Sequence, residues 1–291
     1  MANSRVLIFS VKASVNNTDY YCMLLYALNT LYNNTPRLGF DVIVYYDIDT
    51  LCFSDMHYDA TTLYPDVIFI QKVMPKGIYD RCIPNPKHYY KWLCLEDIIK
   101  YSSYHQIAYF DCDVIFLADL NKIFDKYNGS FYGLFEGYDA LKIDLIGTPH
   151  GMSSGQFIFN REILLNIDHL FYKVISQGGN LCRIINSSDK DDSHKTWLNG
   201  LNEQYAGHKV LINHDISLDQ ISTRHVKYGP STCDIAINGL DIAITNVTTQ
   251  IIHYTNYNAF IFVPSRFRNA HLNELYNRNI KNNKLNRSLW G

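Results

Sequence analysis

The sequence predicts a single Rossmann-like α/β domain whose mainly parallel central sheet is flanked by helices. Two observations carry this prediction. Short apolar runs typical of buried strands alternate with longer segments in which apolar residues recur at helical spacing, a pattern that favours a parallel sheet covered by helices. In addition, 47% of the 291 residues are hydrophobic and the net charge is only −2, which allows a sizeable core and excludes a disordered chain.

The first part of the chain supplies most of the expected strands. Residues 5–10 form a nearly uninterrupted apolar run, as in a strand buried on both faces. A helix is expected over residues 20–32, because its apolar residues recur every three or four positions and Asp19 is suited to cap it. By the same criteria we expect further strands over residues 40–46, 66–70 and 106–110, and a second helix over residues 89–101.

The second part of the chain is less regular. We expect strands over residues 131–135, 156–160, 208–212 and 250–253, a helix over 161–177 and a polar loop over 178–193. No internal repeat or low-complexity linker divides the chain. We therefore predict one domain over residues 1–263, followed by a basic tail over residues 264–291 that forms a docked helix, a lid or a loose end.

Charge and cysteine content narrow the functional class. A protein held to nucleic acid by phosphate contacts is usually more basic than this one. No stretch has the apolar length of a membrane span. The seven cysteines are scattered and form no CxxC pair, which disfavours a disulfide scaffold or zinc ribbon and favours the cytoplasm.

The most informative segment is the pair Asp111 and Asp113, which directly follows the strand expected over residues 106–110. Open α/β sheets bind ligands at the carboxyl ends of their strands. Two carboxylates there repel each other unless a cation lies between them, and hard oxygen ligands suit Mg²⁺ or Mn²⁺. Two chemistries use such a pair: sugar transfer from a nucleotide sugar, and phosphoryl transfer of the haloacid-dehalogenase type with Asp111 as nucleophile. The second normally places its aspartate on the first strand, whereas several strands precede this pair.

The segment 109–124 resembles the DxD region of the glycogenin-like glycosyltransferases of family eight, and further motifs follow in the family's order. Residues 152–159 are similar to its Asn-Ser-Gly strand, and residues 202–204 resemble its Asp-Gln pair. Residues 251–254 resemble the strand that carries a late histidine. Near the N-terminus, Phe9-Ser10-Val11 followed by Tyr20 is similar to the uridine-binding entry. The resemblance covers roughly residues 5–260.

This resemblance implies a GT-A fold, a UDP-sugar donor, Mn²⁺ or Mg²⁺ as cofactor, and retention of anomeric configuration. It assigns the metal to Asp111, Asp113 and His253. It places Tyr20 against uracil, Lys91 against the donor, and Ser154 and Gly155 beside the donor sugar. The residues implied to bind the donor and cofactor are Phe9, Ser10, Val11, Tyr20, Lys91, Asp111, Cys112, Asp113, Ser153, Ser154, Gly155 and Arg266.

The resemblance places Glu203 and Gln204 near the anomeric carbon as the catalytic residues. Glu203 could act as nucleophile in a double displacement. Alternatively, same-face attack proceeds through a short-lived ion pair and Gln204 helps to stabilise positive charge, which is the route that the resemblance favours. The sequence departs from the family at two points: Glu203 stands where the family has Asp, and the family's diphosphate-binding Lys after the late His is absent. Arg266 or Arg268 would then replace that Lys.

We therefore predict a Mn²⁺-dependent retaining hexosyltransferase that moves a sugar, glucose on family analogy, from a UDP-sugar to a glycan or protein hydroxyl. The alternatives are a UDP-galactose-specific transferase, a non-catalytic UDP-sugar binding module and, more remotely, the phosphatase. Self-glucosylation of the glycogenin type is not expected, because residues 231–252 contain no tyrosine. A homodimer is expected from fold analogy.

Overall fold

The computed structural model describes residues 3–12, 19–47, 60–78, 83–136, 151–222, 226–228, 235–238, 241–244 and 251–253. The predicted tail 264–291, with Arg266 and Arg268, lies outside the described residues.

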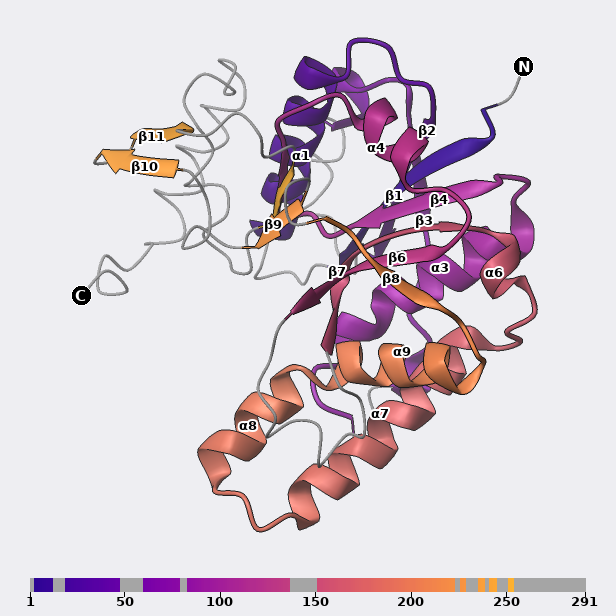
Figure 1. Cartoon of the computed structure of the whole chain (residues 1–291), viewed down its shortest axis with the longest axis vertical. Coiled ribbons are helices and arrows are strands. Elements are labelled where there is room, and N and C mark those ends of the chain that lie inside the picture. The colour runs from indigo at the N-terminus through magenta and orange to yellow at the C-terminus, as the bar shows by residue number, and fades with distance from the viewer. Residues whose placement is uncertain are drawn as a thin grey trace.

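A seven-stranded, mainly parallel sheet forms the centre of the molecule, in the order β3-β2-β1-β4-β7-β6-β8 (Figure 1). Its first four positions are occupied by parallel strands, and β7 runs antiparallel to both β4 and β6, whereas β8 is parallel to β6. The predicted α/β class is therefore confirmed. The strands are β1 (Arg5–Lys12), β2 (Asp41–Asp47), β3 (Val67–Gln71), β4 (Gln106–Phe110), β6 (Phe131–Glu136), β7 (Gly151–Asn160) and β8 (Leu218–Gln220).

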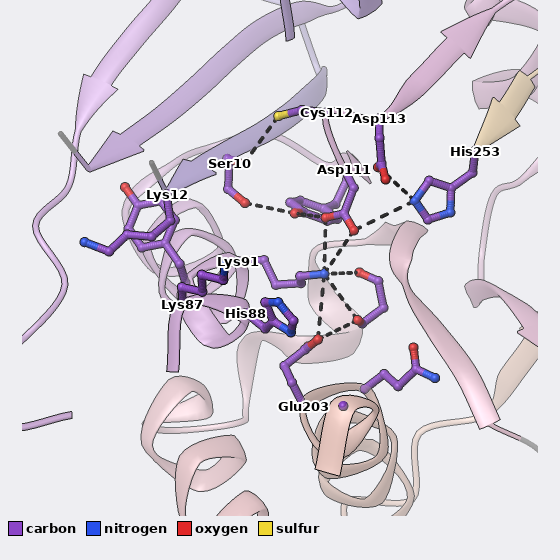
Figure 2. Close-up of a pocket in the computed structure, with 15 residues that line it drawn as sticks. Ser10, Lys12, Lys87, His88, Lys91, Asp111, Cys112, Asp113, Glu203 and His253 are labelled. Carbon is purple, nitrogen blue, oxygen red and sulfur yellow. Dashed lines mark hydrogen bonds and ion pairs between the residues drawn. The ribbon is translucent and has the colours of Figure 1, made fainter. Parts of the chain in front are cut away.

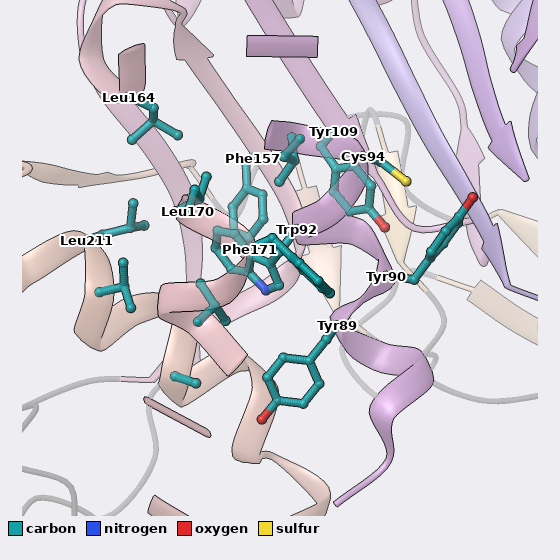
Figure 3. Close-up of a cluster of buried hydrophobic side chains, with 14 of the residues drawn as sticks. Tyr89, Tyr90, Trp92, Cys94, Tyr109, Phe157, Leu164, Leu170, Phe171 and Leu211 are labelled. Atoms are coloured by element: carbon teal, nitrogen blue, oxygen red, sulfur yellow. The ribbon is translucent and has the colours of Figure 1, made fainter. Parts of the chain in front are cut away.

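Helices cover both faces of this sheet, which is why its central strands are apolar on both sides. Along β1, Leu7 and Phe9 belong to the core beneath α1 (Asp19–Asn34), while Val6 and Ile8 belong to the opposite core. This alternation follows from the two-residue period of a strand. The opposite core is rich in aromatic side chains and is covered by α3 (Tyr90–Tyr101), α7 (Leu170–Ser187) and α9 (Asn202–Asn213) (Figure 3).

Shorter elements complete the described part of the molecule. The short strand β5 (Val114–Phe116) follows the acidic pair and forms a three-stranded sheet with β12 (Ile251–His253) and β9 (Val226–Tyr228). A 3-10 turn, η3 (Pro86–Tyr89), leads into α3. Further elements are η2 (Lys76–Ile78), α4 (Leu120–Lys126), α6 (Glu162–Leu165), α8 (Asp192–Gly200), β10 (Ile235–Asn238) and β11 (Asp241–Ile244).

Two predictions for residues 161–193 are wrong. The single helix expected over residues 161–177 is interrupted, because His169 adopts a left-handed conformation between α6 and α7. The loop expected over residues 178–193 is largely helical: α7 continues to Ser187 and α8 begins at Asp192. The segment is polar and begins with two glycines, which are weak helix formers, but α7 packs against its neighbours there and tertiary contacts override intrinsic propensity.

The strand expected over residues 208–212 is also wrong, because these residues lie in α9. A short apolar run does not distinguish a strand from a buried helix segment. By contrast, the strands expected over residues 5–10, 40–46, 66–70, 106–110 and 131–135 are confirmed, and residues 156–160 form the end of the longer β7. Among the described residues, no helix has the length and apolar character needed to cross a membrane.

Candidate functional site

The candidate site lies where β4 ends, at the carboxyl edge of the parallel strands. Asp111 follows β4 directly, and its backbone N–H donates to the Gly155 carbonyl of the neighbouring β7 (2.7 Å). Asp113 immediately precedes β5. A pocket opens beside the two carboxylates. It is lined by Ser10, Lys12, Lys87, His88, Tyr90, Lys91, Tyr109, Asp111, Cys112, Asp113, Ser154, Gly200, Glu203, Gln204 and His253.

Asp111, Asp113 and His253 form a compact group of candidate metal ligands. One ligand atom from each residue lies within 4.8 Å of the others. The Nε2 atom of His253 is 3.0 Å from Asp113 Oδ1 and 3.9 Å from Asp111 Oδ2 (Figure 2). The antiparallel pairing of β12 with β5 sets this geometry, because it places His253 opposite Val114, the residue after Asp113.

Gly155 allows His253 to approach β7 closely. A Cβ atom on Gly155 would lie 2.9 Å from His253 Nε2, 3.1 Å from Nδ1 and closer still to Cε1. Ordinary van der Waals contacts begin at 3.4 Å. The third ligand of the group therefore occupies its position only because residue 155 has no side chain.

The charges of this group depend on one another. Burial acts to raise the pKa of Asp111, but Lys91, His253 and the Tyr109 hydroxyl together hold it below its ordinary value. Burial raises the pKa of Asp113 despite the nearby His253, whereas the two carboxylates outweigh burial and raise the pKa of His253. The two clustered carboxylates supply the hard oxygen ligands that Mn²⁺ or Mg²⁺ prefers, and the buried imidazole adds one nitrogen ligand beside them. These residues therefore fit a divalent cation.

Asp111 is held by donors on two sides. The Tyr109 hydroxyl donates to Oδ1 (2.5 Å) and is itself hydrogen-bonded to the Ser10 hydroxyl (2.9 Å). The Lys91 ammonium lies 3.2 Å from the Asp111 carboxylate and 5.7 Å from the centre of the Tyr109 ring. The chain from Ser10 through Tyr109 thus fixes the carboxylate that faces the candidate cation position.

Lys91 connects the acidic group to the first turn of α9. Figure 2 shows its ammonium between Asp111 on one side and Glu203 on the other. The ammonium lies 3.7 Å from Glu203 Oε2 and donates to the Ser154 carbonyl (3.0 Å) and hydroxyl (3.2 Å). Burial acts to lower the pKa of Lys91, but Asp111 and Glu203 outweigh it and raise this pKa. Lys91 is therefore a buried cation whose charge is balanced by two carboxylates.

Both carboxylate oxygens of Glu203 accept hydrogen bonds. The indole N–H of Trp92 donates to Oε1, and the Ser154 hydroxyl donates to Oε2 (2.6 Å). Burial raises the pKa of Glu203 although these donors and Lys91 act to lower it. The adjacent Gln204 also lines the pocket, and its buried Nε2 has no hydrogen-bond partner among the described residues.

The structure places half of the residues predicted to bind donor and cofactor around the pocket. Ser10, Lys91, Cys112 and Ser154 line the pocket with the acidic group. Among the residues that the structure describes, the other predicted ones do not line the pocket. The side chains of Phe9 and Val11 are buried in the core beneath α1, Ser153 is buried in β7 with its hydroxyl accepting from the Gly155 N–H, and Tyr20 lies in α1 with a side chain outside the described set.

Lys12, Lys87, His88, Tyr90 and Tyr109 also line the pocket and were not predicted. Lys12 is paired with Asp47, which lies on β2 beside it.

Lys87 has no carboxylate within ion-pair distance among the described residues. Burial lowers the pKa of His88 to about 4, with smaller contributions from Lys91 and Lys87 in the same direction and an opposing one from Asp111. The sequence signal for this basic edge is the pair Lys87-His88, one helical turn before Lys91.

Fold and site together define the class: the chain has the GT-A fold of glycosyltransferases, with an acidic pair at the carboxyl end of β4. No protein-family model and no curated protein matches the sequence. Similar solved structures include the galactosyltransferase LgtC in complex with donor and acceptor sugar analogs, at a TM-score of 0.60 and 12% identity, covering 93% of this chain and 95% of LgtC.

Two further solved structures show the same fold. An active-site mutant of LgtC gives a TM-score of 0.56 at 14% identity and covers 93% of this chain and 95% of the other. The bifunctional glycosyltransferase WbbM gives a TM-score of 0.57 at 13% identity, covering 94% of this chain and 51% of WbbM. At such identities the likeness establishes the fold.

Proposed function

We propose that this protein is a metal-dependent retaining glycosyltransferase of the glycogenin-like family eight, which moves a hexose from a UDP-sugar to a glycan or protein hydroxyl. The observation that carries the proposal is the group Asp111, Asp113 and His253 at the carboxyl end of β4 in a GT-A fold. The ordered motifs of the sequence support the family assignment.

The chain's own residues suit the binding of a nucleotide sugar. Asp111, Asp113 and His253 would hold Mn²⁺ or Mg²⁺, which when bound supplies Lewis-acid stabilisation to a leaving diphosphate. Lys91 lies beside this group and presents a buried positive charge to the pocket.

The surroundings of Glu203 support one of the two routes to retention. A nucleophile needs access to the reacting carbon, but Glu203 is buried, both of its oxygens accept hydrogen bonds and one faces the Lys91 ammonium. By contrast, the buried Gln204 Nε2 at the pocket has no hydrogen-bond partner within the part of the chain that the structure describes. This arrangement supports same-face attack, with Gln204 as the polar group near the anomeric carbon and Glu203 as an orienting residue.

A second cation for the donor diphosphate is still required, because the family's lysine after the late histidine is absent. Arg266 or Arg268 remains a proposal, since both lie outside the described residues. Within them, Lys87 lines the pocket as an uncompensated cation and is a second candidate.

For the donor sugar we propose glucose, with galactose as the alternative, which the fold shared with the galactosyltransferase LgtC supports. Self-glucosylation is not proposed, and intact mass after incubation with UDP-glucose should remain unchanged. We also propose a cytoplasmic homodimer, to be tested by sedimentation and by fractionation of cells.

The decisive experiment measures UDP release from a panel of UDP-sugars with and without Mn²⁺. Asp113→Ala should abolish release, whereas Asp125→Asn, an exposed aspartate remote from the pocket, should not. Release that is lost on chelation supports the proposal. Tight Mn²⁺-dependent UDP binding without turnover, even with candidate acceptors, would indicate a binding module instead. Absence of UDP binding would refute the family assignment.

A further inference from the structure

The first turn of α9 is buried without a cap of its own. Its N-cap residue is Leu201, which supplies no side-chain hydrogen bond, yet Asn202, Glu203 and Gln204 are only 0%, 6% and 8% exposed. Buried side-chain oxygens need hydrogen-bond donors, because leaving them unpaired away from water is costly. The donors for Asn202 and Glu203 therefore have to come from neighbouring elements.

Two aromatic side chains provide them. The Tyr89 hydroxyl donates to Asn202 Oδ1, and the Trp92 indole N–H donates to Glu203 Oε1. Both aromatic residues are fully buried (Figure 3). They lie three residues apart across the junction of η3 and α3, a spacing that puts both on one helical face. Consecutive residues of α9 are thus held by neighbouring donors of one helical segment.

Each aromatic ring lies against a helical glycine. A Cβ atom on Gly207 of α9 would lie 2.7 Å from Trp92 Cη2 and 2.8 Å from Cε2. A Cβ atom on Gly178 of α7 would lie 2.8 Å from Tyr89 Cζ and 2.9 Å from Asn202 Oδ1. Glycine inside a helix costs stability, so a compensating role is expected where it recurs. Here each glycine gives the ring the space that it needs to reach α9.

We propose that Trp92, accommodated by Gly207, and Tyr89, accommodated by Gly178, are positioning residues that set the first turn of α9 and thereby orient Glu203 and Gln204. This inference rests on the proposed function, because its consequence is catalytic. The indole holds one Glu203 oxygen, which leaves the other for Ser154 and Lys91. Without the indole N–H, Glu203 can rotate.

The adjacent Gln204 would lose its position with the same turn. Misplacement of a catalytic group by about 1 Å can cost on the order of 100-fold in rate. Since the acidic group and the rest of the pocket lie on other elements, the loss should appear in kcat and leave nucleotide binding nearly unchanged.

The test compares Trp92→Phe and Tyr89→Phe, each of which keeps an aromatic ring and removes the donor. With the UDP-sugar that the wild type uses, we expect kcat to fall roughly 10- to 100-fold and the Kd of UDP with Mn²⁺ to change less than about threefold. Gly207→Ala should reproduce the kcat loss, and its combination with Trp92→Phe should be clearly less than multiplicative. The controls are Trp197→Phe, at a half-exposed tryptophan, and Gly179→Ala, next to Gly178 but with only an ordinary contact at 3.9 Å.

A spectroscopic measurement keeps this inference separate from the proposed function. The chain has three tryptophans, so the indole N–H signals in a ¹⁵N–¹H spectrum can be assigned by substitution. The Trp92 signal should be protected from exchange and should shift in Glu203→Gln, whereas the Trp197 signal should not. If the wild type transfers no sugar, the proposed function fails, and this spectrum alone decides the Trp92 contact. An unprotected Trp92 signal, unchanged kcat in both aromatic variants, or a kcat loss matched by an equal loss of UDP affinity would overturn the inference.

Discussion

Gly155→Ala should weaken metal binding by displacing His253. The added Cβ would lie 2.9 Å from Nε2, whereas ordinary contacts begin at 3.4 Å, so the imidazole must move away by at least about 0.5 Å. Ligand distances in metal sites tolerate only about 0.2 Å. Asp111 should stay in place, because its contact with residue 155 uses the backbone carbonyl. One ligand of the proposed three is therefore disturbed and two remain.

The expected magnitude is that of a misoriented ligand. Changes that misorient metal ligands typically cost about 10- to 100-fold in affinity, or roughly 1.4–2.8 kcal/mol. Titration calorimetry with Mn²⁺ alone would measure the change, and loss of the free-ion signal in electron paramagnetic resonance would check it. Gly77→Ala is the matched control, since a Cβ there meets no atom within 4 Å.

The reasoning is refuted if Gly155→Ala binds Mn²⁺ with wild-type affinity while thermal unfolding confirms that it is folded. It is equally refuted if Gly77→Ala loses affinity to the same extent, because the effect would then not depend on His253.

Three further predictions concern the basic edge of the pocket and the support of β5. Lys87→Ala should raise the Kd of UDP by about 3- to 10-fold, the effect expected for the loss of one partly exposed cation, whereas Lys76→Ala should leave it unchanged. If Lys87→Ala binds UDP with the wild-type Kd, Lys87 does not contact the diphosphate. His88 has a pKa of about 4 in the folded protein and about 6.5 in the unfolded chain, so between these pH values the folded state binds fewer protons. The free energy of unfolding should therefore fall as the pH drops from 6.5 to 4, by at most about 3 kcal/mol. In His88→Gln, the free energy of unfolding measured by denaturation at several pH values should change less over that pH range than in the wild type. An unchanged pH dependence would contradict this. Thr30→Val removes the buried acceptor of the Phe116 N–H, and urea denaturation should show a loss of about 1–3 kcal/mol; a neutral result would mean that the N–H finds another acceptor.

The parts of the fold that could be predicted from the sequence are those in which the local residue pattern is compatible with only one type of secondary structure. The strand at residues 106–110 is buried throughout, and its apolar run shows this without other information. The segment 208–212, in which residues 210–212 are apolar, is equally short but lies in a helix, because α9 packs against α7 and β7. Likewise, the polar segment that begins at Gly178 favours a loop, and only the structure shows that the phenol of Tyr89 packs against this glycine inside a helix.

The candidate site likewise contains residues that the sequence could predict and residues that it could not. The pair Asp111 and Asp113 stands out locally, and the family resemblance linked it to His253, which lies 140 residues beyond Asp113. No local pattern marks Trp92 as a partner of Glu203, since an aromatic residue within a helix is ordinarily core. Their contact depends on the packing of α3 against α9, which only the three-dimensional structure supplies.

The pairing of β12 with β5 gives the last described strand a distinct place in the order of assembly. Among the described strands, the seven-stranded sheet contains none beyond β8, so a nascent chain that has emerged as far as residue 222 already carries all seven and both aspartates. His253 arrives only when β12 docks beside β5. The proposed three-ligand group is therefore complete only once residues 251–253 have been added, later than every described strand of the main sheet.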